Sequence, residues 1–289
     1  MTELVRTRAE LDQALAALRL PGPRVALVPT MGSLHEGHRE LLRVARTVAD
    51  VVVASIFVNP LQFGDPNDLL LYPRSLTADL ELCAAEDAAL VWAPEVDDMF
   101  PTGPPHVRVS AGELGTRYEG AARPGHFDGV LTVVARLLGT VCPDVAVFGR
   151  KDAQQLFLVT RMVTDLELGT EILPVHTVRE PDGLARSSRN ARLTTAGHTT
   201  AELLPRTLAA TRAVAAAGAT VAEVRAAATE VLALGEHVEP PLLADEVAIV
   251  DPETFATVAP DYLGDVLVLI AGRVEGVRLI DNVLLRRKP

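Results

Sequence analysis

The chain has 289 residues, 48% of them hydrophobic, and a formal net charge of −11. This length suffices for one large domain or two smaller ones with a sizeable buried core. The acidic balance, with a pI of about 5.1, disfavours nonspecific binding to nucleic acid or to anionic membranes, because both depend on accumulated Lys and Arg. Any anionic ligand must therefore be held by a local site.

The chain carries no sign of export or of membrane anchoring. No apolar run reaches the length of a membrane span, and the charged first ten residues lack the apolar segment of an export signal. Cys83 and Cys142 are too few for a disulfide framework and lie in apolar helical surroundings, which predicts buried, unpaired thiols. We therefore expect a cytoplasmic protein.

Strand, turn and helix patterns alternate along the first part of the chain, as is typical of β-α-β units. The run at 51–57 is almost entirely apolar and β-branched, so we expect a parallel sheet with helices on both faces. In chain order the patterns predict helix 4–18, strand 25–28, a helix ending near residue 50, strand 51–57, helix 76–86, strand 90–93, helix 127–141, strand 145–148, a helix ending near residue 166, and strand 172–178.

Beyond residue 190 the composition changes to alanine-rich helices and short strands. Helices are expected at about 199–217 and 221–234, and strands at 247–250, 266–273 and 277–279, with a hairpin turn at 274–276. We place a domain boundary near residue 178. The predicted fold class is α/β: a Rossmann-like parallel sheet in residues 1–178, followed by a smaller α+β domain in residues 179–289.

The segment P-T-M-G-S-L-H-E-G-H at 29–38 joins a strand to a helix start. Such a turn presents free backbone N–H groups and the positive end of a helix dipole to a phosphate. His35 and His38, on one face of the first helical turn, add donors. Structural or solvated histidines and half of a metal site are the alternatives, although the other histidines form no metal-binding pattern. Neither a P-loop nor a dinucleotide-binding G-x-G-x-x-G is present.

Polar side chains also follow two other predicted strands, where parallel sheets bind ligands. Asn59 and Gln62 follow the apolar run 51–57, and an amide suits a hydroxyl or carbonyl because it donates and accepts at once. Lys151 follows a later strand and can reach a phosphate, and Gln155 lies one helical turn further on. Gln62 and Gln155 converge on one crevice only if both strands belong to one parallel sheet. Residues that satisfy their own turn are the alternative.

Arginines and serines complete the candidates. Arg123 stands just before a proline near a helix start, where it can meet an anion. The segment 185–190 places Ser187, Ser188 and guanidinium groups together, which suits phosphate contact. A solvated arginine and a helix-capping loop are the ordinary alternatives.

Six blocks occur in order between residues 25 and 193: P-T-M-G-S-L-H-E-G-H, F-V-N-P-L-Q-F, Y-P-R, R-P-G-H-F, F-G-R-K-D-A-Q-Q and S-S-R-N. Together they resemble the pantothenate synthetases, the pantoate:β-alanine ligase family of the H-x-G-H nucleotidyltransferases. The resemblance implies a Rossmann domain, dependence on ATP and Mg²⁺, and a homodimer. It also implies condensation of pantoate with β-alanine through a pantoyl-adenylate.

The resemblance assigns roles to single residues. Catalysis is expected of His38, which matches the family's acid/base histidine, and of His35, Lys151 and Arg189. Pantoate is expected at Gln62, Gln155, Asn59 and Arg123, with Gln62 also near β-alanine. ATP, whose phosphates would hold most of the Mg²⁺ coordination, is expected against Met31, Gly32, Ser33, Leu34, His35, Glu36, Gly37, His38, Gly149, Arg150, Lys151, Asp152, Val178, Arg186, Ser187, Ser188 and Arg189.

The chain departs from the family pattern in three places. Arg150 stands where Glu is usual, Arg186 where Met is usual, and Ala191-Arg192 where an aromatic residue is usual. Three hypotheses follow: an active ligase, a related adenylyltransferase that stops at an adenylated product, and a catalytically weakened paralogue retained as a binding protein. The amide pair of Gln62 and Gln155 suits a small hydroxy acid and favours the ligase.

Overall fold

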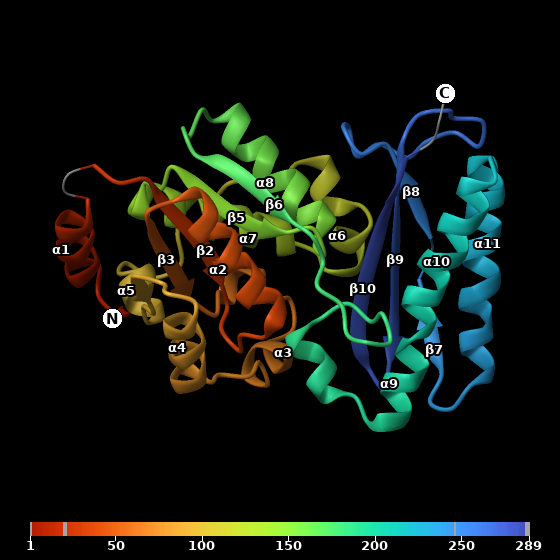
Figure 1. Ribbon diagram of the computed structural model, residues 1–289, viewed down its shortest axis with the longest axis horizontal. Helices are drawn as coiled ribbons and strands as arrows, with labels where there is room; N and C mark the ends of the chain where they lie inside the picture. Colours follow the sequence, from red (N-terminus) through yellow and green to blue (C-terminus); the bar gives the residue numbers. More distant parts are fainter. Residues whose placement is uncertain (1, 20–21, 246, 287–289) are drawn as a thin grey trace. The chain divides into compact units, whose positions relative to one another are not determined.

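The computed structural model describes residues 2–19, 22–245 and 247–286 (Figure 1). By compactness the chain divides into two units, the first made of residues 1–150 and 154–176 and the second of residues 151–153 and 177–289. The predicted boundary near residue 178 leaves residues 151–153 in the first unit, whereas in the structure they group with the second.

The first unit is built on a six-stranded sheet whose described strands all pair in parallel. The spatial order is β1-β4-β3-β2-β5-β6, so the chain leaves β2 in one direction through β3 and later continues on the other side through β5. The strands are β1 Glu3–Val5, β2 Val25–Thr30, β3 Val51–Ile56, β4 Leu90–Trp92, β5 Val145–Gly149 and β6 Glu171–Val175. The strands that precede Gln62 and Gln155 therefore belong to one parallel sheet, and the turns after β2, β3 and β5 leave from the same edge.

Helices cover both faces of this sheet, because alternate strand residues bury on opposite sides (Figure 1). Val25 and Leu27 pack in a cluster with α1 Arg8–Leu18, α7 His126–Val141 and α8 Ala153–Asp165. Ala26 and Val28 pack in a separate cluster with α2 Glu36–Val48 and α4 Leu76–Ala85. Shorter helices are α3 Pro66–Leu70, α5 Val96–Met99 and α6 Glu119–Ala122, together with 3₁₀ turns at Pro60–Gln62 and Glu113–Thr116. The predicted fold of this unit is confirmed.

The second unit is a smaller α+β structure, also as predicted. Its described strands form an antiparallel sheet in the order β10-β9-β7, with β8 also paired to β9. Glu275 and Gly276 both have positive φ, as a two-residue type I′ hairpin between β9 and β10 requires. The elements are a 3₁₀ turn at Ser188–Arg192, α9 Thr195–Ala201, α10 Leu203–Ala216, α11 Val221–Ala233, a 3₁₀ turn at Leu234–His237, β7 Leu242–Ala244, β8 Ala248–Val250, β9 Val266–Val274 and β10 Val277–Leu285.

Several predicted boundaries are wrong for identifiable reasons. Leu4 lies in β1, which pairs with β4, and the opening helix starts only at Arg8, after a capping box between Thr7 and Glu10. The helix predicted at 199–217 is two helices, α9 and α10, and Pro205 stands in the first turn of α10, where no helical N–H is needed.

At the strands, β6 ends at Val175 rather than near Val178, and β10 extends to Leu285 because it pairs with β9 along its whole length. The short strand β7, paired with β9, was missing from the sequence prediction.

The two cysteines differ from each other. Cys83 is fully buried in the core, as predicted, and burial raises the pKa of its thiol to about 12. Cys142 is exposed and ends α7 in the left-handed conformation, so the prediction of a buried thiol is wrong there. Among the described residues, no helix combines the length and apolarity needed to cross a bilayer.

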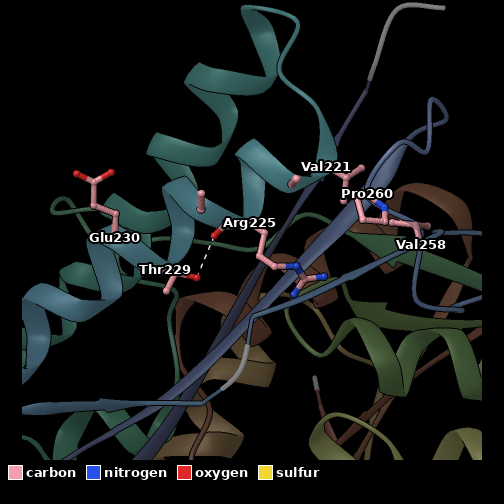
Figure 2. Close-up of a pocket in the computed structure, with 8 residues that line it drawn as sticks. Val221, Arg225, Thr229, Glu230, Val258 and Pro260 are labelled. Carbon is pink, nitrogen blue, oxygen red and sulfur yellow. Dashed lines mark hydrogen bonds between the residues drawn. The ribbon is translucent and has the colours of Figure 1, made fainter.

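A groove of about 480 Å³ lies in the second unit along α11 (Figure 2). Val221, Val258 and Pro260 give it an apolar lining. The guanidinium of Arg225, at its rim, donates to the backbone carbonyl of Val247. The groove contains none of the predicted site residues.

Candidate active site

The turn between β2 and α2 has a left-handed backbone at two successive residues. Gly32 has φ of +81° and Ser33 has φ of +52°. A Cβ on Gly32 would lie 3.0 Å from a carboxylate oxygen of Asp79 and 3.1 Å from the side chain of Ile56. The left-handed backbone therefore favours glycine at position 32, and a Cβ there would need a small shift of the neighbouring side chains.

The carboxylate of Asp79, on α4, occupies the inside of this turn. It accepts hydrogen bonds from the backbone N–H groups of Ser33 at 2.9 Å and Leu34 at 2.8 Å, and from the hydroxyl of Ser75 at 3.1 Å. Asp79 is only 2% exposed. The prediction that this turn offers free backbone N–H groups to a phosphate is therefore wrong for Ser33 and Leu34, because the protein's own carboxylate holds them.

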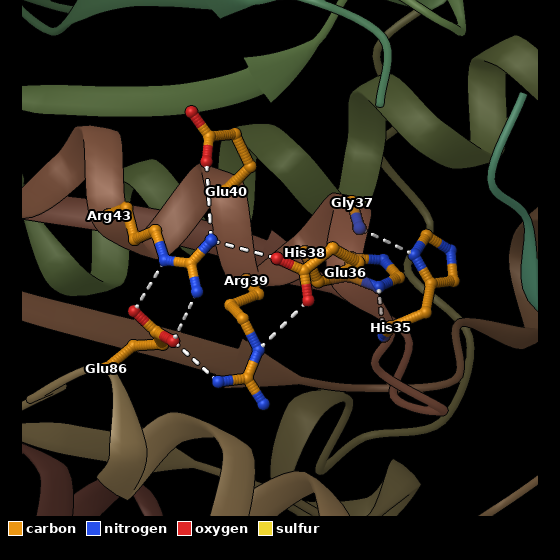
Figure 3. A network of polar contacts seen from close by, with 8 residues as sticks. All are labelled: His35, Glu36, Gly37, His38, Arg39, Glu40, Arg43 and Glu86. Atoms are coloured by element: carbon orange, nitrogen blue, oxygen red, sulfur yellow. Dashed lines mark hydrogen bonds and ion pairs between the residues drawn. The ribbon is translucent and has the colours of Figure 1, made fainter. Parts of the chain in front are cut away.

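The two predicted histidines lie together at the start of α2 (Figure 3). His35 is the N-cap residue, and its Nδ1 accepts from the backbone N–H of Gly37 at 3.1 Å. The Nδ1 of His38 accepts from the backbone N–H of His35 at 3.2 Å, and the ring centroids are 4.2 Å apart. Because a backbone N–H can only donate, the proton of each neutral ring resides on Nε2. Both imidazoles thus carry an N–H donor on the atom remote from the backbone.

Glu36, predicted to contact ATP, belongs to a network of charges on α2 (Figure 3). Its carboxylate lies 2.8 Å from Arg43 and 3.3 Å from Arg39. Both arginines also pair with Glu86 at the end of α4, at 3.0 and 2.7 Å. Because these side chains are partly solvated, each pair adds little stability. Together they join α2 to α4 next to the turn at residues 32–38, which we call the histidine turn.

The amide of Asn59 is engaged with the protein itself. Asn59 is 1% exposed, and its Oδ1 accepts from the backbone N–H of Leu61 at 3.2 Å. Its Nδ2 donates to Oε1 of Gln62 at 3.0 Å and to the carbonyl of Gly129 at 3.1 Å. The Nε2 of Gln62 lies 3.1 Å from Sδ of Met31. The structure therefore brings the loop after β2 and the loop after β3 together at Gln62.

Gly129 lets helix α7 approach this loop. A Cβ at position 129 would lie 2.2 Å from the carbonyl oxygen of Leu61 and 2.7 Å from the backbone nitrogen of Gln62. Ordinary carbon–oxygen contacts are more than about 3 Å, so a side chain at this position would force the loop and the helix apart. The backbone of Gln62 therefore packs directly against the backbone of helix α7.

Arg123 acts on the same loop through a residue that the sequence reasoning did not select, His126. The guanidinium of Arg123 lies 3.0 Å from Nε2 of His126, whose Nδ1 lies 2.9 Å from the carbonyl of Gln62. Arginine only donates, so Nε2 accepts and the Nδ1–H donates to that carbonyl. The R-P-G-H-F block contains His126, so the motif was a signal for this residue. Its buried position next to the Gln62 carbonyl depends on the packing of α7, which the sequence does not show.

Two adjacent glutamines at the start of α8 have different surroundings. Gln154 is 5% exposed; its Nε2 donates to the carbonyls of Leu114 and Arg117, and its Oε1 accepts from the backbone N–H of Glu119. Gln155, the predicted pantoate contact, is half-buried. In the described part of the chain no hydrogen bond joins Gln155 to Gln62.

Residues 151–153 group with the second unit, where Asn282 contacts them. The side-chain amide of Asn282, on β10, donates to the backbone carbonyl of Lys151 at 2.8 Å. Asp152 is exposed beside Lys151. Just before this segment, the backbone N–H of Arg150 donates to the carbonyl of Val175, which continues the β5–β6 pairing beyond Gly149. The position of the Lys151 backbone therefore depends on a residue near the end of the chain.

The second unit also holds the predicted arginine–serine segment. The hydroxyl of Ser187 accepts from the backbone N–H of Arg189 at 3.3 Å and caps the 3₁₀ turn Ser188–Arg192, so the capping interpretation is correct for Ser187. The backbone N–H of Arg186 donates to the carbonyl of Val178 at 2.9 Å.

An ion pair between the half-buried Arg179 and the buried Asp281 precedes this segment. Both terminal nitrogens of Arg179 bond Asp281, at 2.6 and 3.0 Å, and the pKa of Arg179 is raised chiefly by these hydrogen bonds. The carboxylate of Asp281 is almost completely enclosed, so removing either partner would leave a charge without compensation.

His198 does have carboxylate neighbours, contrary to the sequence prediction. In the described residues its Nε2 lies 3.4 Å from Glu180 and its Nδ1 lies 3.5 Å from Asp182. These three side chains place one ligating atom each within 4.8 Å of one another. They became neighbours through the fold, since α9 packs on the turn at 180–183, and the cluster does not include His35 or His38.

The chain matches the family model of pantoate-beta-alanine ligase over residues 3–284. It is 54% identical to a pantothenate synthetase of Acidothermus cellulolyticus over 287 residues, covering 98% of this chain and 92% of that protein. The crystal structure of pantothenate synthetase from Thermus thermophilus is similar with a TM-score of 0.90 and 46% identity, over 97% and 98% of the two chains.

The ligase of Francisella tularensis, solved in complex with β-γ ATP and β-alanine, is similar with a TM-score of 0.81. That similarity covers 98% of both chains at 30% identity. The family match spans nearly the whole of this chain, and it includes the histidine turn, the Asn59–Gln62 loop and the segments around Lys151 and Arg189. The chain therefore belongs to the pantoate-beta-alanine ligase family.

Proposed function

We propose that this protein condenses pantoate with β-alanine to pantothenate, with release of AMP and pyrophosphate from ATP. The observation that carries the proposal is the pair of imidazoles at the start of α2, whose Nδ1 atoms both accept backbone N–H groups. Each ring thereby keeps an Nε2–H donor, and the residues that lead into this turn meet the loop after β3, because Gln62 lies 3.1 Å from Met31. Family membership and the ATP- and β-alanine-bound relative support the same reaction.

In the first step a carboxylate oxygen of pantoate bonds to the α-phosphorus of ATP, and the bond from that phosphorus to the bridging oxygen of pyrophosphate breaks. Negative charge develops on the phosphates, so catalysis needs fixed donors and cations more than a strong base. We assign this work to His35, His38, Lys151 and Arg189. In the second step the uncharged amine of β-alanine attacks the acyl carbon, the carbon–oxygen bond breaks, AMP leaves, and the amine proton passes to solvent.

Several groups are assigned to ATP in this proposal. They are the turn Met31–His38, Gly149, Arg150, Lys151, Asp152, Val178 and the segment Arg186–Arg189. Glu36 contributes indirectly, because its carboxylate pairs with Arg39 and Arg43. Ser33 and Leu34 likewise line the turn without offering the N–H groups that Asp79 holds.

Pantoate and β-alanine are assigned to the loop after β3 and to α8. Gln62 and Gln155 are the proposed hydrogen-bonding partners of pantoate, and Gln62 also lies near β-alanine. Asn59 and Arg123 act through Gln62, since Asn59 bonds its side chain, and Arg123 reaches its carbonyl both directly at 3.5 Å and by way of His126.

Magnesium fits this donor set as an ion held mainly by the ATP phosphates. The carboxylates of Asp79 and Glu36 are engaged with protein groups, whereas that of Asp152 is exposed. Mg²⁺ commonly takes one or two carboxylates together with phosphate oxygens and water, so Asp152 is the proposed protein ligand. When bound, the ion offsets charge on the phosphates. We further propose a cytoplasmic homodimer without nucleic-acid or membrane partners, in keeping with the acidic composition.

The test is product formation from purified protein. ATP and Mg²⁺ are mixed with pantoate, with and without β-alanine, and AMP, pyrophosphate and pantothenate are measured. We expect equimolar AMP and pantothenate only when all substrates are present. Pyrophosphate with an adenylated product that ignores β-alanine would favour the adenylyltransferase, and no AMP under either condition would exclude the ligase.

A further inference from the structure

Asp79 is a buried carboxylate outside the predicted site residues, and all of its described bonds go to the histidine turn or to its own helix start. Oδ2 accepts from the N–H of Ser33, while Oδ1 accepts from the N–H of Leu34 and from the hydroxyl of Ser75. With 2% of its surface exposed, Asp79 has no room to meet a substrate directly. Asp79 can therefore affect the reaction only through the position of the histidine turn.

The turn presents two backbone N–H groups to one carboxylate. Gly32 and Ser33 are left-handed in succession, which is unfavourable for a serine, and the two N–H groups that follow point to the same place. Such a concave arrangement of N–H groups ordinarily binds an anion from solution. Here the side chain of Asp79 fills it.

The direction of the backbone after the turn decides where both imidazoles lie. His35 follows Leu34 directly, and the backbone N–H of His35 bonds Nδ1 of His38 at 3.2 Å. The ring of His35 is in turn oriented by the N–H of Gly37. A rotation of the peptide at Ser33 or Leu34 would therefore move His35 and His38 together.

We propose that Asp79 is a positioning residue for adenylyl transfer: by binding the N–H groups of Ser33 and Leu34, it sets the positions of His35 and His38. Its charge also keeps phosphate out of the turn, so that ATP meets the imidazole N–H groups rather than the backbone. The inference rests on the proposed function for its kinetic consequences.

Asp79→Asn is the first test, with Ser75→Ala as the matched control. An amide keeps one oxygen for one N–H but presents an NH₂ group to the other N–H, where two donors repel. Ser75→Ala removes the third bond to Asp79 and leaves both turn contacts intact, since the Ser75 side chain makes no cap bond of its own. We expect Asp79→Asn to lower kcat roughly 10- to 100-fold, as for a displacement of about 1 Å in a catalytic group. Ser75→Ala is expected to stay within about twofold of the wild type.

A double-mutant cycle separates positioning from a general loss of structure. Each substitution, Asp79→Asn and His38→Ala, is made alone and together, and kcat is corrected for folded protein by the thermal melting curve. If Asp79 acts through the histidines, Asp79→Asn costs much less in the His38→Ala background than in the wild type. Equal cost in both backgrounds overturns the proposal.

A spectroscopic measurement tests the same idea without using activity. Long-range ¹H–¹⁵N spectra of histidine-labelled protein report which ring nitrogen carries the proton, and His35→Ala and His38→Ala assign the two signals. We expect Nε2–H forms in the wild type, shifted signals in Asp79→Asn and unchanged signals in Ser75→Ala. Unchanged signals in Asp79→Asn overturn the proposal.

The outcomes for Asp79 and for the proposed function are distinct. A wild type that forms no pantothenate refutes the function, while the histidine spectra still decide the role of Asp79. If Asp79→Asn alone does not fold, Ser33→Gly with Asp79→Asn replaces it, because glycine accepts the left-handed backbone; Ser33→Gly alone is then the reference.

Discussion

Gly129→Ala tests whether the position of Gln62 determines use of pantoate. The added Cβ would lie 2.2 Å from the carbonyl oxygen of Leu61, 2.4 Å from its carbonyl carbon and 2.7 Å from the nitrogen of Gln62. To restore an ordinary contact, the loop and helix α7 must separate by roughly 1 Å. Asn59 bonds both the Gly129 carbonyl and the Gln62 side chain, so the separation reaches the amide of Gln62.

We expect Gly129→Ala to change the rate of catalysis more than the free energy of unfolding. Alanine in a helix interior is better than glycine by about 1 kcal/mol, and overpacking costs about 1–3 kcal/mol, so the two partly cancel. The melting temperature is then expected to fall by no more than a few degrees. A misplacement of about 1 Å near the reacting groups can cost about 100-fold, so we expect kcat/KM for pantoate to fall roughly 10- to 100-fold.

The assay is pantothenate formation as a function of pantoate concentration, with ATP affinity measured in the absence of pantoate as the internal control. Gly139→Ala is the matched variant, because Gly139 lies in the same helix and a Cβ there meets nothing within 4 Å. That variant is expected to keep wild-type kinetics and an equal or higher melting temperature. Wild-type pantoate kinetics in Gly129→Ala would refute the argument.

Four further experiments test other parts of the site and of the fold. His38→Ala should lower turnover by roughly two to four powers of ten, because a positioned hydrogen-bond donor is lost, and should keep the melting temperature. An unchanged rate would show that His38 has no catalytic role. Lys151→Ala should act similarly, and Lys151→Arg should not fully restore the rate, because a planar fork replaces a point charge; equal rates in all three proteins would contradict this. Asn282→Ala should raise the KM for ATP several-fold through the loss of its bond to the Lys151 carbonyl, and Asn282→Asp, which cannot donate, should do the same. At about pH 8 a disulfide reagent should modify the exposed Cys142 quickly and the buried Cys83 only on unfolding. The thiolate is the reactive form, and burial raises the pKa of Cys83 to about 12, so the reactivity of Cys83 should rise with pH toward that value.

The parallel sheet was predictable because its strands are buried on both faces. β3 is apolar except for Ser55, and most of β2 is apolar as well, and such runs are typical of central strands between two helical layers. β1 was not predictable in the same way, because its three residues include one that is exposed and its pairing with β4 lies 87 positions away at Glu3 and Leu90. Short edge strands are defined by their partner rather than by their own pattern.

The histidine turn was found from the sequence, but its use was only partly predicted. Strand, glycine and helix start were correct, and they place His35 and His38 side by side. The backbone donors were wrong at Ser33 and Leu34, because the prediction treated the turn as if it faced only solvent and ligand. Asp79 lies 46 positions beyond Ser33, and no local pattern connects them.

Residues that support the site are harder to identify from sequence than residues that contact the ligand, for a physical reason. A side chain that meets a ligand must suit its charge and shape, so its residue type is restricted and a motif results. A supporting residue only has to bring one donor or acceptor to a given point, and any element that passes nearby can provide it. The carbonyl of Lys151 needs a donor, and it receives one from Asn282, 131 positions later. The supporting residues of this site therefore follow from the fold, and their substitution ought to alter the geometry of groups that the motifs already identify.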